Sequence, residues 1–143
     1  MSEKVIRVFY KSKKNNKKVA LAIAEEVGVT AESIESSGIQ AAAVSADILF
    51  LGCAILGGNV PPEVDAFVEQ LNKDNIQQIV LFSANGFGTD QFGPLREKLA
   101  AKGMNVAQEA FVCKGRGFVV INIGKPGAEE LAAAKAFARK MMS

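Results

Sequence analysis

The fold is decided near the N-terminus, where the sequence reads VIRVFY over residues 5–10, KSKKNN over 11–16 and KKVALAIA over 17–24. The first segment is rich in β-branched residues and predicts a strand, and the second is a polar loop. In the third, apolar side chains recur at helical spacing, at Ala20, Ile23, Ala24 and Val27. A loop between a strand and a helix directs backbone N–H groups and the positive end of the helix dipole toward an anion. A phosphate-bearing cofactor is therefore the first hypothesis.

Positive charge is concentrated in the same region. Residues 1–18 hold seven cations against Glu3 alone, a net charge of +6, so the remaining 125 residues carry −4 within a total of +2. The cations are Lys4, Arg7, Lys11, Lys13, Lys14, Lys17 and Lys18. A solvated lysine face is the simplest interpretation of such a cluster. Nucleic acid is not an expected partner, because no aromatic residues are interleaved with the lysines and the rest of the chain is acidic.

Length and composition indicate one globular unit. The chain has 143 residues, of which 49% are hydrophobic and 22% charged, so we expect a single domain over residues 1–143 with its own core. It contains no run of 18 apolar residues, so no membrane span is expected. Glu3, Lys4 and Arg7 interleave with Val5 and Ile6, which does not match a secretory signal. We therefore expect a cytoplasmic location.

Strand and helix patterns alternate along the chain. Strands are predicted over residues 5–10, 33–35, 47–53, 76–83 and 105–112. Helices are predicted over 17–27, 62–71, 92–101 and 128–142, and a helical turn within 39–45. The third and fourth strands are continuously apolar, which is typical of strands covered on both faces. The pattern predicts an α/β fold with a doubly wound, five-stranded parallel sheet and helices on both faces.

Polar and glycine-rich loops follow four of the predicted strands, over residues 11–16, 54–60, 84–90 and 114–117. The carboxyl ends of parallel strands meet at one edge of a sheet, and ligands of such folds bind there. The four loops therefore predict a binding site at that edge.

The sequence offers little support for other chemistry. It has no histidine and two cysteines, so a transition-metal site and a Ser-His-Asp triad are not expected. Cys53 and Cys113 end the third and fifth predicted strands, roughly 9–10 Å apart across the strand between them, which is too far for a disulfide. Both are expected to be small buried hydrophobic residues. We predict no catalytic residues and no metal ligands.

Five segments together resemble a known family. They are residues 10–20, residues 47–52 followed by Pro61 and Pro62, residues 81–88, residues 111–115 and residues 124–131. In this order and spacing they look like a short-chain flavodoxin, and the resemblance covers nearly the whole chain. It implies the strand order 2-1-3-4-5 and non-covalently bound flavin mononucleotide (FMN). It also implies the passage of single electrons between redox partner proteins, a reductase and an acceptor enzyme.

The resemblance also implies which residues bind the cofactor. The phosphate would lie in the loop formed by Lys11, Ser12, Lys13, Lys14, Asn15, Asn16 and Lys17. The flavin ring would lie between two loops, one formed by Leu56, Gly57, Gly58 and Asn59, the other by Ser83, Ala84, Asn85, Gly86, Phe87 and Gly88.

The phosphate loop departs from the family pattern of hydroxyl residues followed by Thr-Gly-Asn-Thr. Lys11 and Lys13 stand at hydroxyl positions, Lys14 at the glycine, and Asn16 at the last threonine, so only Asn15 matches. The chain also has no tryptophan, its one tyrosine is Tyr10 at the end of the first strand, and residues 56–60 contain no aromatic, which leaves ring stacking to Phe87. The lysines would supply attraction for the phosphate, and an acceptor would present an acidic patch to them.

Two other functions remain open. The altered loop and the absent tryptophan favour a flavodoxin-like domain that has lost flavin and acts as a binding or regulatory module. A small FMN-dependent reductase of a quinone or similar substrate is the third alternative.

Overall fold

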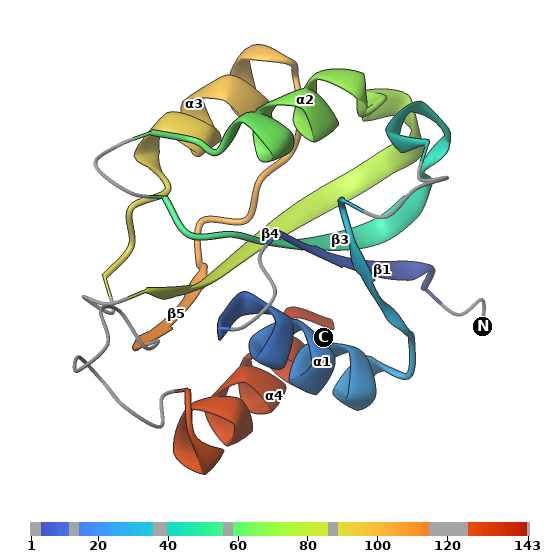
Figure 1. Cartoon of the computed structure of the whole chain (residues 1–143). Helices are drawn as coiled ribbons and strands as arrows, with labels where there is room; N and C mark the ends of the chain where they lie inside the picture. Colours follow the sequence, from blue (N-terminus) through green and yellow to red (C-terminus); the bar gives the residue numbers. More distant parts are fainter. Residues whose placement is uncertain are drawn as a thin grey trace.

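A five-stranded parallel sheet forms the middle layer of the fold, with the strand order β2-β1-β3-β4-β5 (Figure 1). The computed structural model describes residues 4–11, 15–35, 40–55, 59–85, 89–114 and 126–142. The strands are β1 (Ile6–Tyr10), β2 (Ala31–Ser33), β3 (Ala46–Gly52), β4 (Ile76–Asn85) and β5 (Phe111–Lys114). The helices are α1 (Asn15–Val27), α2 (Pro62–Gln70), α3 (Gly93–Ala101) and α4 (Ala128–Met142), with 3₁₀ turns η1 (Ala41–Ala43) and η2 (Lys73–Asn75). The predicted fold class and strand order are confirmed.

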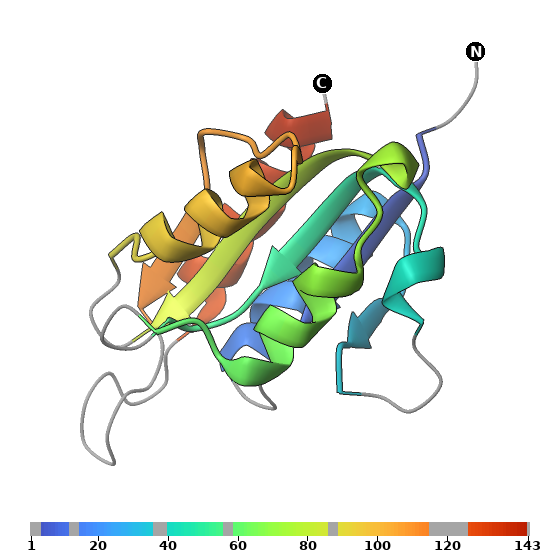
Figure 2. The ribbon, with the colours of Figure 1, turned by 90° about the horizontal axis from the view of Figure 1, so that it is seen from above.

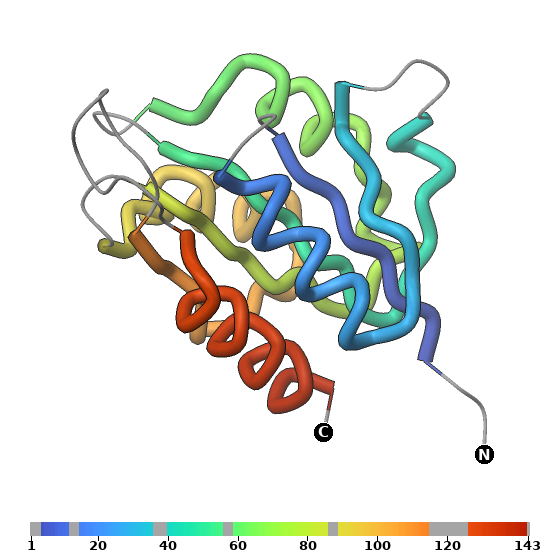
Figure 3. The backbone as a smooth tube through the Cα atoms, turned by 60° about the horizontal axis from the view of Figure 1, so that its bottom comes forward, coloured from blue at the N-terminus to red at the C-terminus, as the bar shows by residue number. Residues whose placement is uncertain are grey.

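Helices cover both faces of the sheet. In Figure 1, α2 and α3 lie above it and α1 and α4 below it. The view from above puts α2 and α3 in front of the strands, and the view with the bottom brought forward puts α1 and α4 in front (Figures 2 and 3). Each pair of helices packs on its own cluster of buried side chains.

Strand β3 shows how the sequence fills both layers. Ile48 and Phe50 belong to the cluster beneath α1 and α4, whereas Leu49 and Leu51 belong to the cluster beneath α2 and α3. All four are at most 3% exposed. Successive side chains of a strand point to opposite faces, so a continuously apolar strand is what two covered faces require.

The fifth predicted strand is wrong as one continuous element. Val106 pairs alone with Ile79, and regular pairing resumes only where Phe111 meets Phe82. Between these two pairs β4 advances three residues and its neighbour five, so an unbroken ladder cannot form. Within the interruption, the Arg96 guanidinium donates a hydrogen bond of 2.8 Å to the carbonyl of Ala107.

The remaining boundaries shift by small amounts. Strand β2 begins and ends two residues earlier than predicted, so the two ranges share only Ser33. Beyond the strand the chain turns, and the backbone N–H of Glu35 donates to the Ser33 hydroxyl at 3.1 Å. Helix α1 begins two residues earlier than predicted, and β4 continues two residues further, to Asn85. The predicted helical turn within 39–45 is confirmed as η1.

Within the part of the chain that the structure describes, no helix is long and apolar enough to span a membrane. The same residues contain no group of three or more acidic or cysteine side chains placed to hold a metal ion. Cys53 and Cys113 are buried and free, as predicted.

Candidate functional site

The carboxyl ends of the strands gather at one edge of the sheet. The arrowheads of β3, β4 and β5 point to the same side in Figure 2. The register pairs Tyr10 with Gly52, and Gly52 with Phe82, so the ends of β1 and β3 lie level near the end of β4. Lys11 continues this alignment, because its backbone N–H donates to the carbonyl of Gly52 at 2.8 Å.

Three buried polar side chains mark this edge. They are Asn16 at 1% exposure, Ser83 at 3% and Asn85 at 5%. A buried polar group lowers stability unless it forms hydrogen bonds, so each of these side chains needs a hydrogen-bond partner at the strand ends. All three are among the residues that the sequence resemblance implicated in cofactor binding.

Asn16 joins the first turn of α1 to the end of β4. Its side-chain oxygen accepts a hydrogen bond of 2.9 Å from the backbone N–H of Ala84, which lies 68 positions away in the sequence. Ala84 is 1% exposed, so both ends of this bond are shielded from water.

Asn85, the last residue of β4, forms hydrogen bonds with Ser83 and Thr89. Its side-chain nitrogen donates to the carbonyl of Thr89 at 3.0 Å and to the Ser83 hydroxyl at 3.4 Å. Its side-chain oxygen accepts from the backbone N–H of Thr89 at 3.4 Å. We call Asn16, Ser83, Ala84, Asn85 and Thr89 the edge junction.

The charge beside the edge junction suits an anion. The first turn of α1 has no acidic residue and carries the exposed Lys17 and Lys18. Cations at a helix N-terminus are unfavourable unless a negative group lies nearby. Lys11 is half-buried, and its ammonium lies 4.0 Å from the Glu63 carboxylate. Lys114 ends β5 as an exposed side chain.

The two cysteines near this edge are chemically quiet. Burial raises the pKa of the Cys53 thiol to about 12, although the Lys11 ammonium acts in the opposite direction. Burial also raises the pKa of Cys113 to about 11, with a further contribution from the Glu130 carboxylate. Both thiols therefore stay protonated at neutral pH and are poor nucleophiles.

No protein-family model and no curated protein matches the sequence, but solved structures do. A flavodoxin from the domain Archaea gives a TM-score of 0.72 at 16% identity, over 96% of this chain and 95% of that one. Oxidised flavodoxin 1 from Bacillus cereus gives 0.67 at 18% identity, over 94% and 95%. The chain has the flavodoxin fold. A third match is a Fusobacterium nucleatum flavodoxin with one lysine replaced by glycine and FMN bound, at a TM-score of 0.60 and 11% identity over 96% and 94%.

The flavodoxin fold brings together several of the residues predicted for the site. Asn16 and Ala84 are hydrogen-bonded, Ser83 and Asn85 lie beside them, and Asn59 is exposed ahead of α2. Lys11, Asn15 and Lys17 are also described, in or beside the start of α1. The other predicted residues, Ser12, Lys13, Lys14, Leu56, Gly57, Gly58, Gly86, Phe87 and Gly88, lie outside the described residues.

Thr89, which lies beside the candidate site, is not among the site residues that the sequence predicts. It binds Asn85 through its backbone atoms, so its side-chain type carries no signal. Asn85, four residues before Thr89, is the one signal in the sequence, because Asn side chains often form hydrogen bonds with the backbone of nearby residues.

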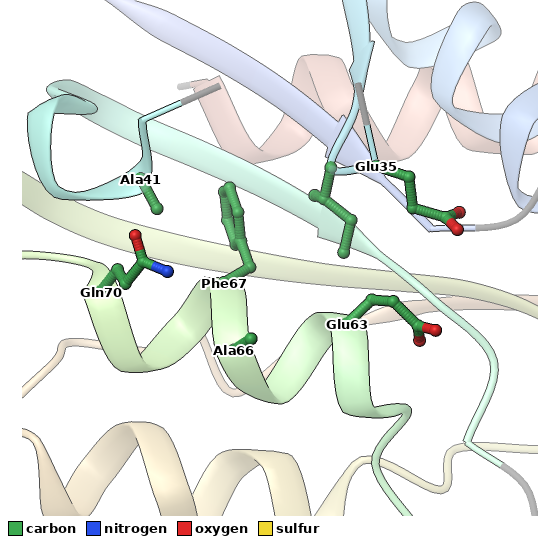
Figure 4. A pocket seen from close by; sticks show the side chains of 7 residues that line it. Glu35, Ala41, Glu63, Ala66, Phe67 and Gln70 are labelled. Atoms are coloured by element: carbon green, nitrogen blue, oxygen red, sulfur yellow. The ribbon is translucent and has the colours of Figure 1, made fainter. Parts of the chain in front are cut away.

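Sequence reasoning also missed a groove beside α2, with a cavity volume of about 390 Å³ (Figure 4). We call it the α2 groove; Ile34, Glu35, Ala41, Glu63, Ala66, Phe67 and Gln70 line it. In Figure 4 the carboxylates of Glu35 and Glu63 lie at one end and Gln70 at the other. The Phe67 ring packs on Phe9 with ring centroids 5.0 Å apart.

Proposed function

We propose that this chain binds FMN non-covalently at the edge junction and carries single electrons between a reductase and an acceptor enzyme in the cytoplasm. The observation that carries the proposal is the gathering of the buried polar side chains Asn16, Ser83 and Asn85 at the strand ends. In the flavodoxin fold this edge is the one where ligands of doubly wound sheets bind.

The described residues fit the phosphate of FMN. The first turn of a helix directs backbone N–H groups and the positive end of the helix dipole toward an anion, and Lys17 adds positive charge in the first turn of α1. Lys11, Lys13 and Lys14 would complete the basic loop that the sequence predicts. An ammonium about 6 Å from one negative charge gains roughly 2–3 kcal/mol at an effective dielectric of about 20, less after screening. Each missing hydroxyl bond loses roughly 1.5–3 kcal/mol, so the lysines are of the right magnitude to replace the hydroxyls.

The flavin ring would lie between residues 56–59 and residues 83–88, with Phe87 as its aromatic neighbour. FMN, when bound, supplies reversible one-electron chemistry. The chain's own residues would hold the cofactor. The thiols of Cys53 and Cys113 stay protonated at neutral pH and supply no nucleophile there.

The exposed lysines also suggest the kind of redox partner. Lys17 and Lys18 lie next to the proposed cofactor site, and both are exposed. Complementary charge steers association, so we expect the acceptor to present an acidic patch to this edge and to bind more weakly as salt rises.

Titration of the apo-protein with FMN tests the proposal. Binding with a dissociation constant below about 100 μM is expected, and no binding at that concentration would contradict the proposal. The Lys13→Ala/Lys14→Ala variant should lose more affinity for FMN than for riboflavin, which lacks the phosphate, and more at low salt than at high. Lys135→Ala/Lys140→Ala, which removes equal charge from α4, is the control and should bind both ligands as the wild type does.

The second candidate function is a flavodoxin-fold module that has lost flavin. Its support is the loop in which Lys11, Lys13 and Lys14 replace hydroxyl and glycine residues of the family pattern. The same titration decides between the two, because such a module binds neither FMN nor riboflavin.

A further inference from the structure

Asn16 stands in an unusual place for its residue type. Asparagine is a weak helix former inside helices, and near a helix start its side chain ordinarily bonds to the backbone of the same turn. Here the side-chain oxygen reaches another element and accepts from the N–H of Ala84 at 2.9 Å. The side chain is committed to β4 rather than to its own helix.

The sheet explains why Ala84 needs this partner. The N–H of Cys53 donates to the carbonyl of Phe82 at 3.2 Å, so Phe82 faces β3. Alternate residues of a parallel strand face the same neighbour, which directs Ala84 toward β3 as well. The pairing of β3 with β4 ends at Gly52 and Phe82. Asn16 therefore replaces the missing strand as the acceptor for a buried N–H.

The position of this bond in the chain is equally informative. Asn16 lies in the predicted phosphate loop, residues 11–17, and Ala84 lies in the predicted ring loop, residues 83–88. One hydrogen bond therefore links the chain segments that carry the two halves of the proposed site. Asn85 and Thr89, which stand on either side of residues 86–88 in the sequence, are hydrogen-bonded to each other.

We propose that Asn16 is a positioning residue, which fixes the distance between the phosphate loop and the ring loop. The inference rests on the proposed function. FMN occupies both loops with one molecule, so it gains affinity from their fixed separation, whereas riboflavin or inorganic phosphate occupies only one. Loss of the Asn16–Ala84 bond should therefore weaken the whole ligand and leave its two parts nearly unaffected.

The Asn16→Ala variant tests this. We expect FMN affinity to fall at least about tenfold, while riboflavin affinity and the inhibition of FMN binding by inorganic phosphate each change less than about threefold. Hydrogen exchange of the Ala84 amide should become faster in the same variant. Val68→Ala, which removes buried methyl groups from α2, is the control for lost stability and should keep the wild-type ratio of FMN to riboflavin affinity.

Each contrary outcome has its own meaning. If Asn16→Ala lowers the affinities for FMN and riboflavin equally, Asn16 has only a structural role. If inorganic phosphate inhibits FMN binding less in the variant than in the wild type, Asn16 is a direct phosphate ligand. Either result overturns the inference and leaves the proposed function intact. A wild-type protein that binds neither FMN nor riboflavin overturns the proposed function and the inference together. If Asn16→Ala does not fold, Asn16→Ser replaces it, since the shorter hydroxyl cannot span the same distance, and the same outcomes apply.

Discussion

The edge junction and the α2 groove are built in opposite ways. In the edge junction the polar side chains are buried and hydrogen-bonded, as Asn16 is to Ala84 and Asn85 is to Thr89. In the α2 groove the carboxylates are exposed, and an apolar floor that includes Phe67 lies beneath them. Buried polar bonds fix a single arrangement, because an unpaired buried group is unfavourable, whereas exposed carboxylates tolerate several. The edge junction therefore has the rigidity that a cofactor site requires.

Helix α2 itself differs between its two flanks. Toward α3, Lys98 pairs with Asp65 and with Glu69, the latter at 2.7 Å, and the Lys102 ammonium donates to the carbonyl of Glu69 at 3.0 Å. Toward the α2 groove, the helix presents Ala66, Phe67 and Gln70. The groove therefore borders the flank of α2 that these ion pairs do not hold.

The largest effect is expected from Phe67→Ala. The ring is 5% exposed and packs on Phe9, so its removal should lower the free energy of unfolding by about 3–5 kcal/mol. Phe67→Leu, which keeps most of the apolar volume, should lose less than about 1.5 kcal/mol. Urea unfolding measures both. FMN affinity of the folded fraction should stay at the wild-type value, and a loss of affinity in Phe67→Leu would contradict the separation of the two regions.

Gly52→Ala should have the next largest effect, because it disturbs the backbone beneath the edge junction. A Cβ atom at this position would lie 2.0–2.6 Å from atoms of the Phe82 ring, which is fully buried. Overpacking of this kind should lower stability by about 1–3 kcal/mol. The matched control is Gly93→Ala, where a Cβ meets nothing within 4 Å outside its chain neighbours, so stability should change by less than about 1 kcal/mol. Equal thermal shifts in the two variants would contradict the close packing at Gly52.

Asn85→Ala should follow, because it removes the bonds that hold Thr89 and the Ser83 hydroxyl. A loss of about 1–2 kcal/mol in stability is expected, together with weaker FMN binding. Gln91→Ala removes an exposed bond of 3.2 Å to the Thr89 hydroxyl and should change stability by less than about 0.5 kcal/mol. Undiminished FMN affinity in Asn85→Ala would show that this end of the edge junction does not support the cofactor.

The sequence predicts the layered fold well because that fold depends on local patterns. Continuous apolar runs such as residues 48–51 show that both faces of the sheet are covered, and helical spacing places α1 and α4. The strand order came from the family resemblance. The sequence predicts the fifth strand as one element, whereas its interruption appears only in the register against β4, where Val106 pairs with Ile79 and Phe111 with Phe82.

The sequence predicts the edge of the sheet at which the candidate site lies, but not the contacts within it. The strand-end loops identified the edge, since every parallel strand ends there. The bond between Asn16 and Ala84 was not predictable, because it joins residues 68 positions apart and depends on the register between β3 and β4. The α2 groove was not predictable either, because it forms where the turn after β2 lies opposite α2. The sequence of residues 33–35 alone does not determine that position.

The smallest effect is expected at the other flank of α2, from Lys98→Met. Hydrogen bonding to Lys98 lowers the pKa of Glu69, and hydrogen bonding to Asp65 and Glu69 raises the pKa of Lys98. A lowered carboxyl pKa stabilises the folded state above the unfolded-state value near 4.5, and this contribution disappears as the pH falls through the folded-state pKa. The raised ammonium pKa contributes below 10.5 and is lost only at higher pH.

Urea midpoints of Lys98→Met should therefore fall less than those of the wild type between pH 6 and pH 3, and the two proteins should differ most near neutral pH. The difference should be small, because exposed ion pairs are screened by water and salt. Lys140→Met, which removes the cation of a surface pair with Glu109 at 2.8 Å, is the control for the loss of one surface charge. If the urea midpoints of Lys98→Met and the wild type depend on acid pH in the same way, the ion pairs of Lys98 do not hold α2 against α3. The two flanks of α2 would then differ only in their apolar packing.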